Sequence, residues 1–555
     1  MTTIARPAGA SPPKAPSLHA PADTVEGRAK AANDFVRKYR WLILLGLITA
    51  AIMEVLDTTI INVALPQMAG NLSATQEEIG WVSTGYILAN VIFLPMTAFF
   101  TSRFGRRRYL TFSIVLFIVS SFFCGTSSTL MELVFWRVLQ GAGGAALLST
   151  AQATLRQIFP VEEQGLVQSV FLLGIIVAPT LGPTLGGWIT DNYTWNWCFF
   201  INVPIGIVST FLVTSFLRDP PDQDKHTGDI DWLGISLLTV GIGSLQYVLE
   251  EGNSKDWFAD DLIRRLAIVA GVSLITMLWW ELNPKNTHPV VDFRVLKNRT
   301  LTASMFLFIA LGFGLYGGVF LFPLFAQGIL HFTPTETGLV MLPGGLATAC
   351  SALVCGFLLN GKNPKADPRW LIFIGVILFA ISMWRMGHLT TASGIDDVRT
   401  ALLVRGFGLG FLFAPINNAA YASIKPQEAQ QASGLINLCR QLGGAFGIAV
   451  LLNQLSKATQ FHRVDLVANL VGGSAITDQR LAAITQAFVA RGMDAFSAKQ
   501  AALGAMSGQV QAQAAMLGFN DSWIFILIVF VGVAPAILLL RRPRRGGMVA
   551  EVDAH

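Results

Sequence analysis

Long apolar runs, each about the length of a membrane-spanning helix, follow one another from residue 41 to residue 541. A helix needs about 20 apolar residues to cross the hydrocarbon layer of a bilayer, and about fourteen segments of this length can be placed. Short polar stretches separate them, as in a bundle of helices joined by loops. The predicted crossings lie near residues 41–65, 79–101, 110–127, 130–155, 164–190, 195–217, 230–250, 262–282, 299–328, 335–359, 370–390, 397–422, 432–456 and 521–541. The pattern therefore predicts an all-α membrane protein.

The composition agrees with this prediction. Hydrophobic residues make up 53% of the 555 residues, charged residues make up only 13%, and the mean hydropathy is +0.54. A soluble domain carries about 25% charged residues, so the soluble classes are excluded. The net charge is +5, but the basic residues lie beside apolar segments, and nucleic acid is not an expected partner.

Basic residues mark one side of the predicted bundle. The stretches "RFGRRR" (103–108) and "RRPRR" (541–545) fall on the same side, whereas the loop "LEEGNSKDWFADD" (249–261) falls on the opposite side. Short cytoplasmic loops hold the excess of Lys and Arg in membrane proteins. We therefore expect a multi-pass protein with both termini in the cytoplasm.

The predicted crossings fall into two halves. The stretch "VLQGAGGAAL" (138–147) resembles "LVRGFGLGFLF" (403–413), so that Gly141 and Gly143 correspond to Gly406 and Gly408. Parallel repeats are typical of transporters, which place the substrate path between them. We expect a disordered cytoplasmic tail at 1–40, a six-helix bundle at 41–217, a linker with two extra transmembrane helices at 218–298, a second six-helix bundle at 299–545 and a cytoplasmic tail at 546–555.

A long loop at 457–520 is expected on the outer side of the second bundle. It is rich in Ala and Gln, and its periodicity predicts short amphipathic helices. Two interpretations are open: a cap over the outer mouth of the bundle, or a docking site for a periplasmic protein.

Two carboxylates interrupt the first apolar run, "ITAAIMEVLDTTIINVAL", at Glu54 and Asp57. A charge at the centre of a membrane helix costs about 2.5 to 3.5 kcal/mol, so it is rarely kept without a function. Residues three apart share a helix face, where two ionised carboxylates repel. This pair predicts a proton carrier, and we expect Asp57 to be that carrier, while a plain ion pair with a buried arginine is the alternative.

The expected partner is Arg137 in the fourth crossing, with Gln140 one turn along the same face. An arginine keeps its proton and must meet a carboxylate, a carbonyl or water within the membrane. We therefore expect Arg137 to tune proton binding on the first helix.

Small residues repeat every four positions in the fifth crossing, "GIIVAPTLGPTLGGW" (174–188). Such spacing lets helices approach closely, and proline removes a backbone hydrogen bond and bends a helix. The segment is expected to be tightly packed and kinked. The residues concerned are Gly174, Ala178, Pro179, Gly182, Pro183, Gly186 and Gly187.

Several amides within apolar spans are candidates for a substrate cavity. They are Asn62, Gln327, Asn417 and Asn418. Polar lining would favour a proton-coupled transporter of one specific metabolite, such as a siderophore, a sugar or an aromatic acid. Phe-rich stretches such as "GGVFLFPLFAQ" (317–327) favour an apolar cargo instead.

Other classes have little support in the sequence. No phosphate-binding GxxxxGK[ST] loop is present, and the seven histidines show no metal-ligand spacing, so we expect neither a cofactor, a metal nor an enzyme. A sensor that binds a ligand without moving it is the alternative from another class. It would carry a sizeable signalling domain in the cytoplasm, where we expect only the two tails.

Several separate motifs resemble the fourteen-helix drug:proton antiporters of the major facilitator superfamily, of EmrB/QacA type and particularly of the EmrB branch. The stretches "LDTTIINVALP" (56–66), "RVLQGAGGA" (137–145) and "GIIVAPTLGPTLGG" (174–187) look like the first-helix, proton-coupling and antiporter motifs of that group. The resemblance implies a fold of two six-helix bundles plus two inserted helices.

The resemblance also implies a function. It implies an inner-membrane pump that exports hydrophobic or amphipathic toxic compounds while it admits protons, with a periplasmic adaptor protein and an outer-membrane channel as partners of the EmrB branch. We expect proton binding at Asp57, tuned by Glu54 and Arg137, to exclude drug binding.

One motif departs from the family pattern. The loop "AFFTSRFGRRR" (98–108) aligns with the gating motif Gly-x-x-x-Asp-Arg-x-Gly-Arg, but Ala98 and Ser102 replace its Gly and its Asp. Arg103, Gly105 and Arg106 remain. We therefore expect a gating loop without its own carboxylate.

Overall fold

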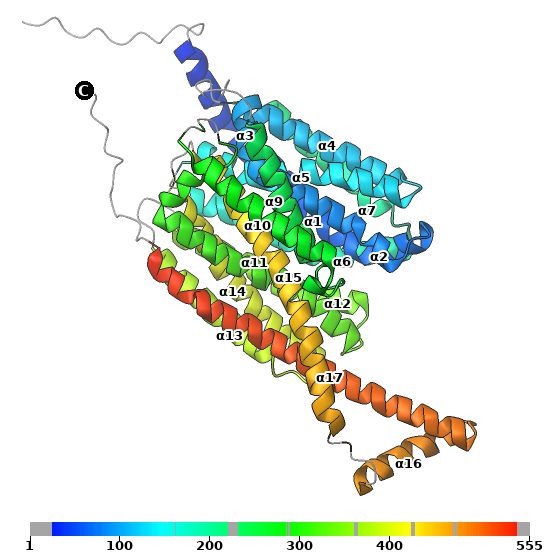
Figure 1. The fold of residues 1–555 in the computed structure, drawn as a ribbon. Coiled ribbons are helices and arrows are strands. Elements are labelled where there is room, and N and C mark those ends of the chain that lie inside the picture. The colour runs from blue at the N-terminus through cyan, green and yellow to red at the C-terminus, as the bar shows by residue number, and fades with distance from the viewer. Residues whose placement is uncertain are drawn as a thin grey trace, which may run out of the picture.

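The computed structural model describes residues 25–160, 163–219, 231–284, 286, 289–359, 365–422, 424, 428–468, 470 and 474–540. Helices make up nearly all of these residues, and no strand occurs among them. They run side by side as one elongated bundle (Figure 1).

The first part of the bundle ends before residue 220. Its helices are α1 (Val25–Asn71), α2 (Gln76–Ile79), α3 (Trp81–Phe104), α4 (Arg106–Thr126), α5 (Leu130–Ile158), α6 (Gln164–Asn192), α7 (Trp197–Phe200) and α8 (Asn202–Phe216). The inserted pair follows as α9 (Trp232–Glu251) and α10 (Asp261–Leu282), with the short 3-10 helices η1 (Trp257–Ala259) and η2 (Phe293–Lys297).

The remaining helices form the second part. They are α11 (Arg299–Gly328), α12 (Pro334–Leu359), α13 (Pro368–Met386), α14 (Ile395–Ala422), α15 (Ala429–Ala468), α16 (Ala475–Val489), α17 (Ala495–Val533) and the 3-10 helix η4 (Ala534–Leu539).

As far as its residues are described, each predicted crossing coincides with a helix or with two consecutive helices, which are α7 and α8 for 195–217 and α17 and η4 for 521–541. Within the described part of the chain, twelve helices are long and apolar enough to cross a membrane. The helices α5 and α6, of 29 residues each, cover the two other predicted crossings. The count of fourteen crossings stays a prediction.

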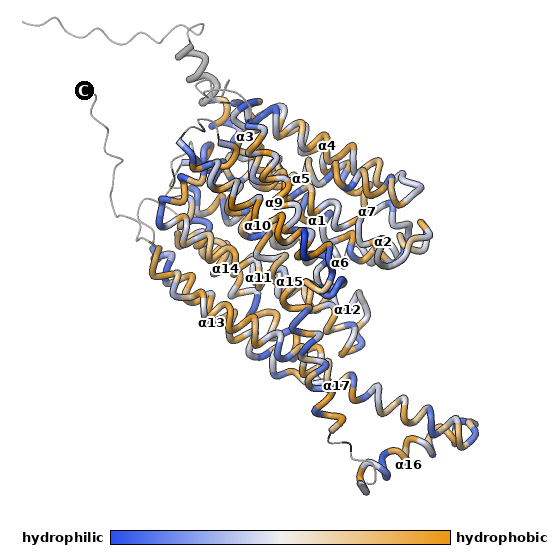
Figure 2. The backbone as a smooth tube through the Cα atoms, viewed as in Figure 1, coloured by the Kyte–Doolittle hydropathy of each residue, from blue (hydrophilic) through white to orange (hydrophobic). Residues whose placement is uncertain are grey.

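Apolar side chains cover the outside of the bundle as well as its inside. On α10, Ile275 is 73% exposed and Trp279 is 67% exposed, and Figure 2 shows hydrophobic residues along much of α10. In water such a surface would be costly. The bundle is therefore built to lie in a lipid bilayer.

Two expectations about the ends and loops need correction. Helix α1 begins at Val25, with a break in helical geometry at Tyr39, so residues 25–40 are helical rather than disordered. The sequence of this stretch, rich in Ala, Arg and Lys, is a good helix former. Residues 1–24 and 541–555 lie outside the described residues.

The second correction concerns the loop at 457–520. It contains one short helix, α16, as expected, but most of it continues the membrane helices, because α15 runs on to Ala468 and α17 already begins at Ala495. The three helices form a hairpin that projects beyond the bundle (Figure 1).

The internal repeat is visible in the packing of α5 and α14. A Cβ atom on Gly141 of α5 would lie 2.2 Å from the carbonyl oxygen of Tyr86 in α3, and one on Gly406 of α14 would lie 2.1 Å from that of Gly344 in α12. The next pair, Gly143 and Gly408, touches the backbone of α4 and of α13 in the same way. The corresponding glycines therefore make corresponding close approaches. The boundaries of the two halves stay a prediction.

The two predicted halves meet along two lines of contact. Helix α6 packs against α12, and α3 and α5 pack against α15. Near one end of the contact between α6 and α12, Gly338 faces Thr184, and near the other end Gly356 faces Ser169. The halves are thus in contact near both ends of α6. The inserted helix α9 lies against α3, α15 and its partner α10.

Candidate functional site

Asp57 of α1 is joined to three side chains inside the first half. Its Oδ2 atom lies 2.6 Å from Nη1 of Arg137 on α5, and the two side chains are 0% and 1% exposed. Its Oδ1 atom accepts hydrogen bonds from Nε2 of Gln140 at 3.0 Å and from Nδ2 of Asn202 at 2.7 Å. Both oxygens of this buried carboxylate are therefore satisfied, as a buried charge requires.

Arg137 is held just as firmly. Its Nε atom donates to the carbonyl oxygen of Val82 at 2.9 Å, and its Nη1 atom also donates to Oε1 of Gln140 at 2.8 Å. The guanidinium lies 4.4 Å from the ring centre of Tyr86 and 5.7 Å from that of Phe199. The aromatic faces add cation–π attraction in this buried site.

All of these partners belong to the predicted first half. A rocking motion of the two halves would therefore leave the ion pair of Asp57 and Arg137 intact. The sequence predicts the pairing of Arg137 with a carboxylate of the first helix, and the structure contains it. The role of Asp57 as the proton carrier stays a prediction, and its alternative, an ion pair with a buried arginine, is compatible with these contacts.

Glu54 has different surroundings. It is 4% exposed, and its Oε1 and Oε2 atoms accept hydrogen bonds from Nδ2 of Asn90 at 3.3 Å and from the backbone N–H of Leu148 at 3.1 Å. The Oδ1 atom of Asn90 in turn accepts a hydrogen bond from Nε2 of Gln441 at 3.0 Å. Because Gln441 belongs to α15, this chain of hydrogen bonds runs from the carboxylate into the second half.

A layer of polar contacts joins the halves on the side predicted to be cytoplasmic. It connects α5 to α15 through three hydrogen bonds between polar side chains and backbone. They run from Ser433 Oγ to the carbonyl oxygen of Ser149 (2.7 Å), from Gln430 Nε2 to Thr150 Oγ1 (3.2 Å) and from Asn437 Nδ2 to Gln152 Oε1 (2.9 Å). The two halves are therefore in direct polar contact on this side.

The small-residue ridge of α6 packs against α1. A Cβ atom on Gly174 would lie 2.9 Å from Ile52, one on Gly182 2.0 Å from Oγ1 of Thr59, and one on Gly186 2.7 Å from the carbonyl oxygen of Ile60. Ala178 is buried, whereas Gly187 has open space beside it. The backbone at Pro179 and Pro183 is helical, and their side chains lie outside the described residues.

The gating loop turns at Gly105, whose φ of +86° favours glycine. A Cβ atom there would lie 2.8 Å from Oδ2 of Asp219, and the Oδ1 atom of Asp219 accepts a hydrogen bond from the backbone N–H of Arg107 at 2.8 Å. Arg106 donates to Gln157 and to the carbonyl oxygen of Arg218, and Arg103 also has a partner. Asp219, which follows α8, thus brings to this loop the carboxylate that its own sequence lacks.

The four amides predicted for a substrate cavity do not share one site. Asn417 is buried and donates to Oε1 of Gln168 at 3.5 Å, a further contact between the halves that joins α14 to α6. Asn418 is half-buried and Gln327 is exposed near the end of α11. Asn62 is exposed and accepts a hydrogen bond from Ser83 at 3.4 Å. No hydrogen bond between described residues joins any two of the four.

Sequence reasoning missed several polar residues of the site. Each is a polar side chain within an otherwise apolar run, which is the signal that could have revealed it. They are Asn90 in "YILANVIFL", Asn202 in "FFINVPIG", and Asn437, Arg440 and Gln441 in "GLINLCRQLGG".

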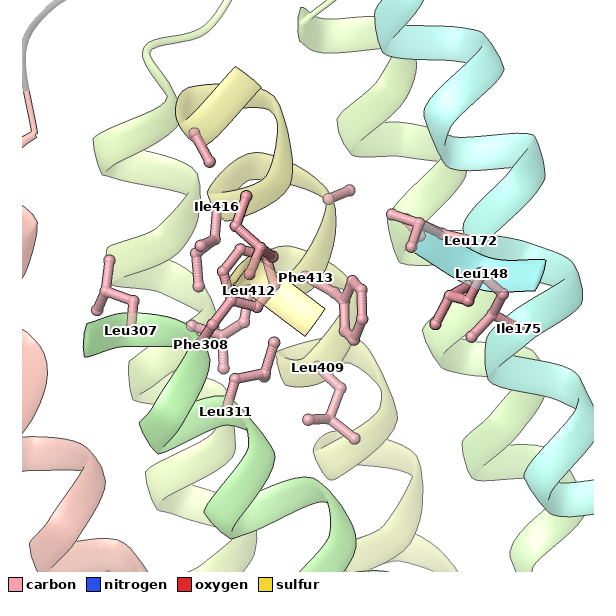
Figure 3. Close-up of a cluster of buried hydrophobic side chains, with 14 of the residues drawn as sticks. Leu148, Leu172, Ile175, Leu307, Phe308, Leu311, Leu409, Leu412, Phe413 and Ile416 are labelled. Atoms are coloured by element: carbon pink, nitrogen blue, oxygen red, sulfur yellow. The ribbon is translucent and has the colours of Figure 1, made fainter. Parts of the chain in front are cut away.

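Apolar side chains of both halves share the interior beside this site. Leu148 of α5 with Leu172 and Ile175 of α6 lie across from Leu409 and Phe413 of α14 (Figure 3), and all five belong to one buried cluster. The interface between the halves is thus polar near Glu54 and hydrophobic beside it.

Comparisons with known proteins agree with this architecture. The family model of the Major Facilitator Superfamily matches residues 47–448. The chain is 33% identical over 505 residues to the multidrug export protein EmrB of Haemophilus influenzae, which covers 90% of this chain and 96% of that protein. It is 32% identical over 509 residues to the fatty acid resistance protein FarB of Neisseria gonorrhoeae, covering 91% of this chain and 97% of that protein.

The fold is also that of solved transporters. The crystal structure of the human organic anion transporter MFSD10 aligns with a TM-score of 0.52 at 12% identity, covering 90% of this chain and 99% of that one. At this identity the likeness concerns the fold alone. The chain is a multi-pass membrane transporter of the Major Facilitator Superfamily, and within it the chain belongs to the family of the EmrB multidrug export proteins.

Proposed function

We propose that this transporter exports hydrophobic or amphipathic compounds across the cytoplasmic membrane in exchange for protons. The observation that carries the proposal is the position of Glu54, a buried carboxylate on α1 whose hydrogen bonds reach the second half through Asn90 and Gln441. An acid between two halves that move against each other can meet water from alternate sides.

In this proposal Glu54 carries the proton, and Asp57 does not. Asp57 and Arg137, with Gln140, form a fixed ion pair that keeps α1, α5 and the α7–α8 segment together. Glu54 lies one turn away on α1, so the charges of this pair set the electrostatic environment of the carrier. This reverses the roles that the sequence suggested for the two carboxylates.

Proton entry supplies enough free energy to drive the export of cargo against a gradient. One elementary charge that crosses the membrane potential contributes about 2.3 kcal/mol per 100 mV, and one pH unit contributes about 1.4 kcal/mol. One proton therefore supports more than a tenfold gradient of cargo.

Two observations support an apolar or amphipathic cargo. The first is the hydrophobic cluster of both halves beside Glu54 (Figure 3). The second is that three similar proteins are named for multidrug export, for fatty acid resistance and for colistin resistance. A specific polar metabolite would call for converging polar side chains, and the four candidate amides do not converge.

We further infer the cellular location of the pump and its orientation in the membrane. The distribution of basic loops supports an inner-membrane location with both termini in the cytoplasm. The hairpin of α15, α16 and α17 then projects outward, where it offers exposed apolar side chains such as Ile476 and Phe496. This surface suits a periplasmic adaptor that leads to an outer-membrane channel.

The test combines cells and membrane vesicles. In a strain that lacks its own efflux pumps, expression of this chain should raise the inhibitory concentration of several unrelated apolar drugs. In inverted vesicles with an acidic lumen, the same drugs should release protons. Resistance to one polar metabolite alone, or no proton release with any drug, contradicts the proposal.

A further inference from the structure

A second buried arginine lies on α15, in the second half. Arg440 is 3% exposed. Its Nη2 atom donates to Oδ1 of Asn437 at 3.0 Å, whereas its Nε atom has no hydrogen-bond partner among the described residues. A buried charged donor without an acceptor is costly. The free Nε–H group therefore points to an acceptor that the described part of the chain does not supply.

Arg440 also has no carboxylate partner. None of the ion pairs between described residues includes it. Glu54, a buried acid of α1, has both carboxylate oxygens bonded elsewhere, to Nδ2 of Asn90 and to the backbone N–H of Leu148. The positive charge of Arg440 is thus left without a bonded counter-charge in this structure.

The buried arginine of the first half shows the contrast. Nη1 of Arg137 pairs with Asp57 and also donates to Gln140, and its Nε atom donates to the carbonyl oxygen of Val82. Arg440 lacks both the carboxylate and the Nε contact. A guanidinium that serves packing alone would be strongly unfavourable in this condition. The difference indicates that Arg440 is kept for a ligand.

Arg440 lies where the two halves meet. Its neighbours on α15 both bond to the first half, since Nδ2 of Asn437 donates to Gln152 of α5 at 2.9 Å and Nε2 of Gln441 donates to Asn90 of α3 at 3.0 Å. Transporters built from two repeats place the substrate path at this interface. The position suits a charge that meets the cargo.

An apolar surface begins beside the guanidinium. The guanidinium lies 5.6 Å from the ring centre of Phe413 on α14 and 6.0 Å from that of Tyr316 on α11. Phe413 also belongs to the hydrophobic cluster of both halves, in which it and Leu409 lie across from Leu172 of α6 (Figure 3). Ligand sites are mostly apolar, with a few polar groups that fix the orientation of the ligand. One cation at the edge of an apolar surface fits an amphipathic anion.

We propose that Arg440 binds the anionic head group of the cargo, and that Phe413 and the apolar cluster hold its apolar part. This inference rests on the proposed function and narrows the cargo to amphipathic anions, with a carboxylate as the fitting head group. The planar guanidinium carries several N–H donors, and its bond to Asn437 leaves enough of them for both oxygens of a carboxylate. The carboxylate supplies the missing acceptor and the missing charge together.

The test measures the binding of matched probes to the full-length protein in lipid nanodiscs at neutral pH. Radiolabelled decanoate is the anionic probe, and decan-1-ol and decyltrimethylammonium are the neutral and cationic probes of the same chain length. Binding to nanodiscs without protein is subtracted. The wild type should bind decanoate about tenfold more tightly than either other probe. Equal affinity for the three probes, or no saturable binding of decanoate, contradicts the inference without any variant.

Arg440→Gln should weaken decanoate binding by about ten- to a hundredfold, because hydrogen bonds between charged groups are lost, and should leave the binding of decan-1-ol unchanged. Arg440→Lys keeps the charge without the planar donors and should have an intermediate affinity. The matched control is Arg405→Gln. It removes a buried arginine of α14 that donates to the carbonyl oxygen of Gly318 at 3.4 Å, and it should bind decanoate as the wild type does.

Four results would overturn the inference. They are a wild-type affinity for decanoate in Arg440→Gln, an equal loss of decanoate and decan-1-ol binding in that variant, an equal loss of decanoate binding in Arg405→Gln, and displacement of decanoate by chloride at equal concentration. The last result would assign Arg440 to an inorganic anion. If Arg440→Gln does not fold, Phe413→Ala tests the apolar part of the site. It should weaken the binding of both decanoate and decan-1-ol, and unchanged binding of both contradicts the inference.

The two proposals fail separately. Decanoate binding that depends on Arg440, without drug-driven proton release in vesicles, defeats the proposed function alone. Drug-driven proton release by a protein that binds decanoate and decan-1-ol equally well defeats the inference alone.

Discussion

Nη1 of Arg137 lies 2.6 Å from Oδ2 of Asp57, and neither side chain is more than 1% exposed. Asn202 and Gln140 complete the shell of the carboxylate. An ion pair so buried is strongly destabilising when one partner is removed, because the other charge is left uncompensated.

We therefore expect Asp57→Asn to destabilise the protein by about 3 to 5 kcal/mol. The measurement is thermal unfolding in detergent, followed by the loss of monodisperse protein. The double variant Asp57→Asn with Arg137→Gln removes both charges and should recover part of the loss. If Asp57→Asn has the melting temperature of the wild type but no longer transports protons, this prediction is contradicted and Asp57 is the proton carrier.

The ridge on α6 gives a second prediction with a built-in control. Gly182→Ala would place a Cβ atom 2.0 Å from Oγ1 of Thr59, whereas Gly187→Ala enters open space. The first change should separate α6 from α1 and cost about 1 to 3 kcal/mol, and the second should be close to neutral. Thermal unfolding of the two variants measures this difference in stability. Equal stability would show that this close approach does not hold the helices together.

The contact of α6 with α12 predicts a conformational effect. Gly356→Val would crowd Oγ of Ser169 and the carbonyl oxygen of Gly165, at 2.2 and 2.8 Å from the new Cβ atom. We expect this change to keep the predicted cytoplasmic side open, whereas Gly328→Val, with nothing nearby, should not. Labelling of a cysteine placed at Asn417 by a membrane-impermeant thiol reagent in inverted vesicles measures the opening. Equal labelling in both variants would contradict the expectation.

The outer hairpin gives a prediction for pH. Asp494 caps α17 by accepting hydrogen bonds from the N–H groups of Phe496 and Ser497 at 3.0 and 3.1 Å. Hydrogen bonds from Ser497 and Phe496 lower the pKa of Asp494 below its usual 3.8. The cap therefore stabilises the helix start at neutral pH and is lost as the pH falls below about 4. Amide exchange at the two residues should accelerate there, and Asp494→Ala should show fast exchange already at pH 7.

The sequence was sufficient for the helices because each carries its own signal. About 20 apolar residues between polar loops identify a crossing, and the repeated glycines Gly141 and Gly406 pack alike. The lengths of the helices in the loop at 457–520 could not be predicted in the same way. Its Ala-rich stretches are equally compatible with short helices and with long continuations of α15 and α17, and only the packing of the complete chain decides between them.

The sequence identified the charged residues of the polar site, but it did not predict the role of each one. Intramembrane charge singled out Glu54, Asp57 and Arg137, but helix periodicity alone does not say which carboxylate meets the arginine. The answer depends on Asn202, Asn90 and Gln441, which come from distant parts of the chain. Their positions follow from the way the helices pack, which one sequence does not contain.

The central claim is that Glu54 exchanges its proton in step with the cargo. Drug-induced proton release from inverted vesicles measures this directly, with Glu54→Gln against Glu132→Gln, a half-buried acid at the start of α5. The account predicts that Glu54→Gln still reaches the membrane and binds drug but releases no protons, while Glu132→Gln behaves as wild type. Proton release by Glu54→Gln at the wild-type rate would contradict it.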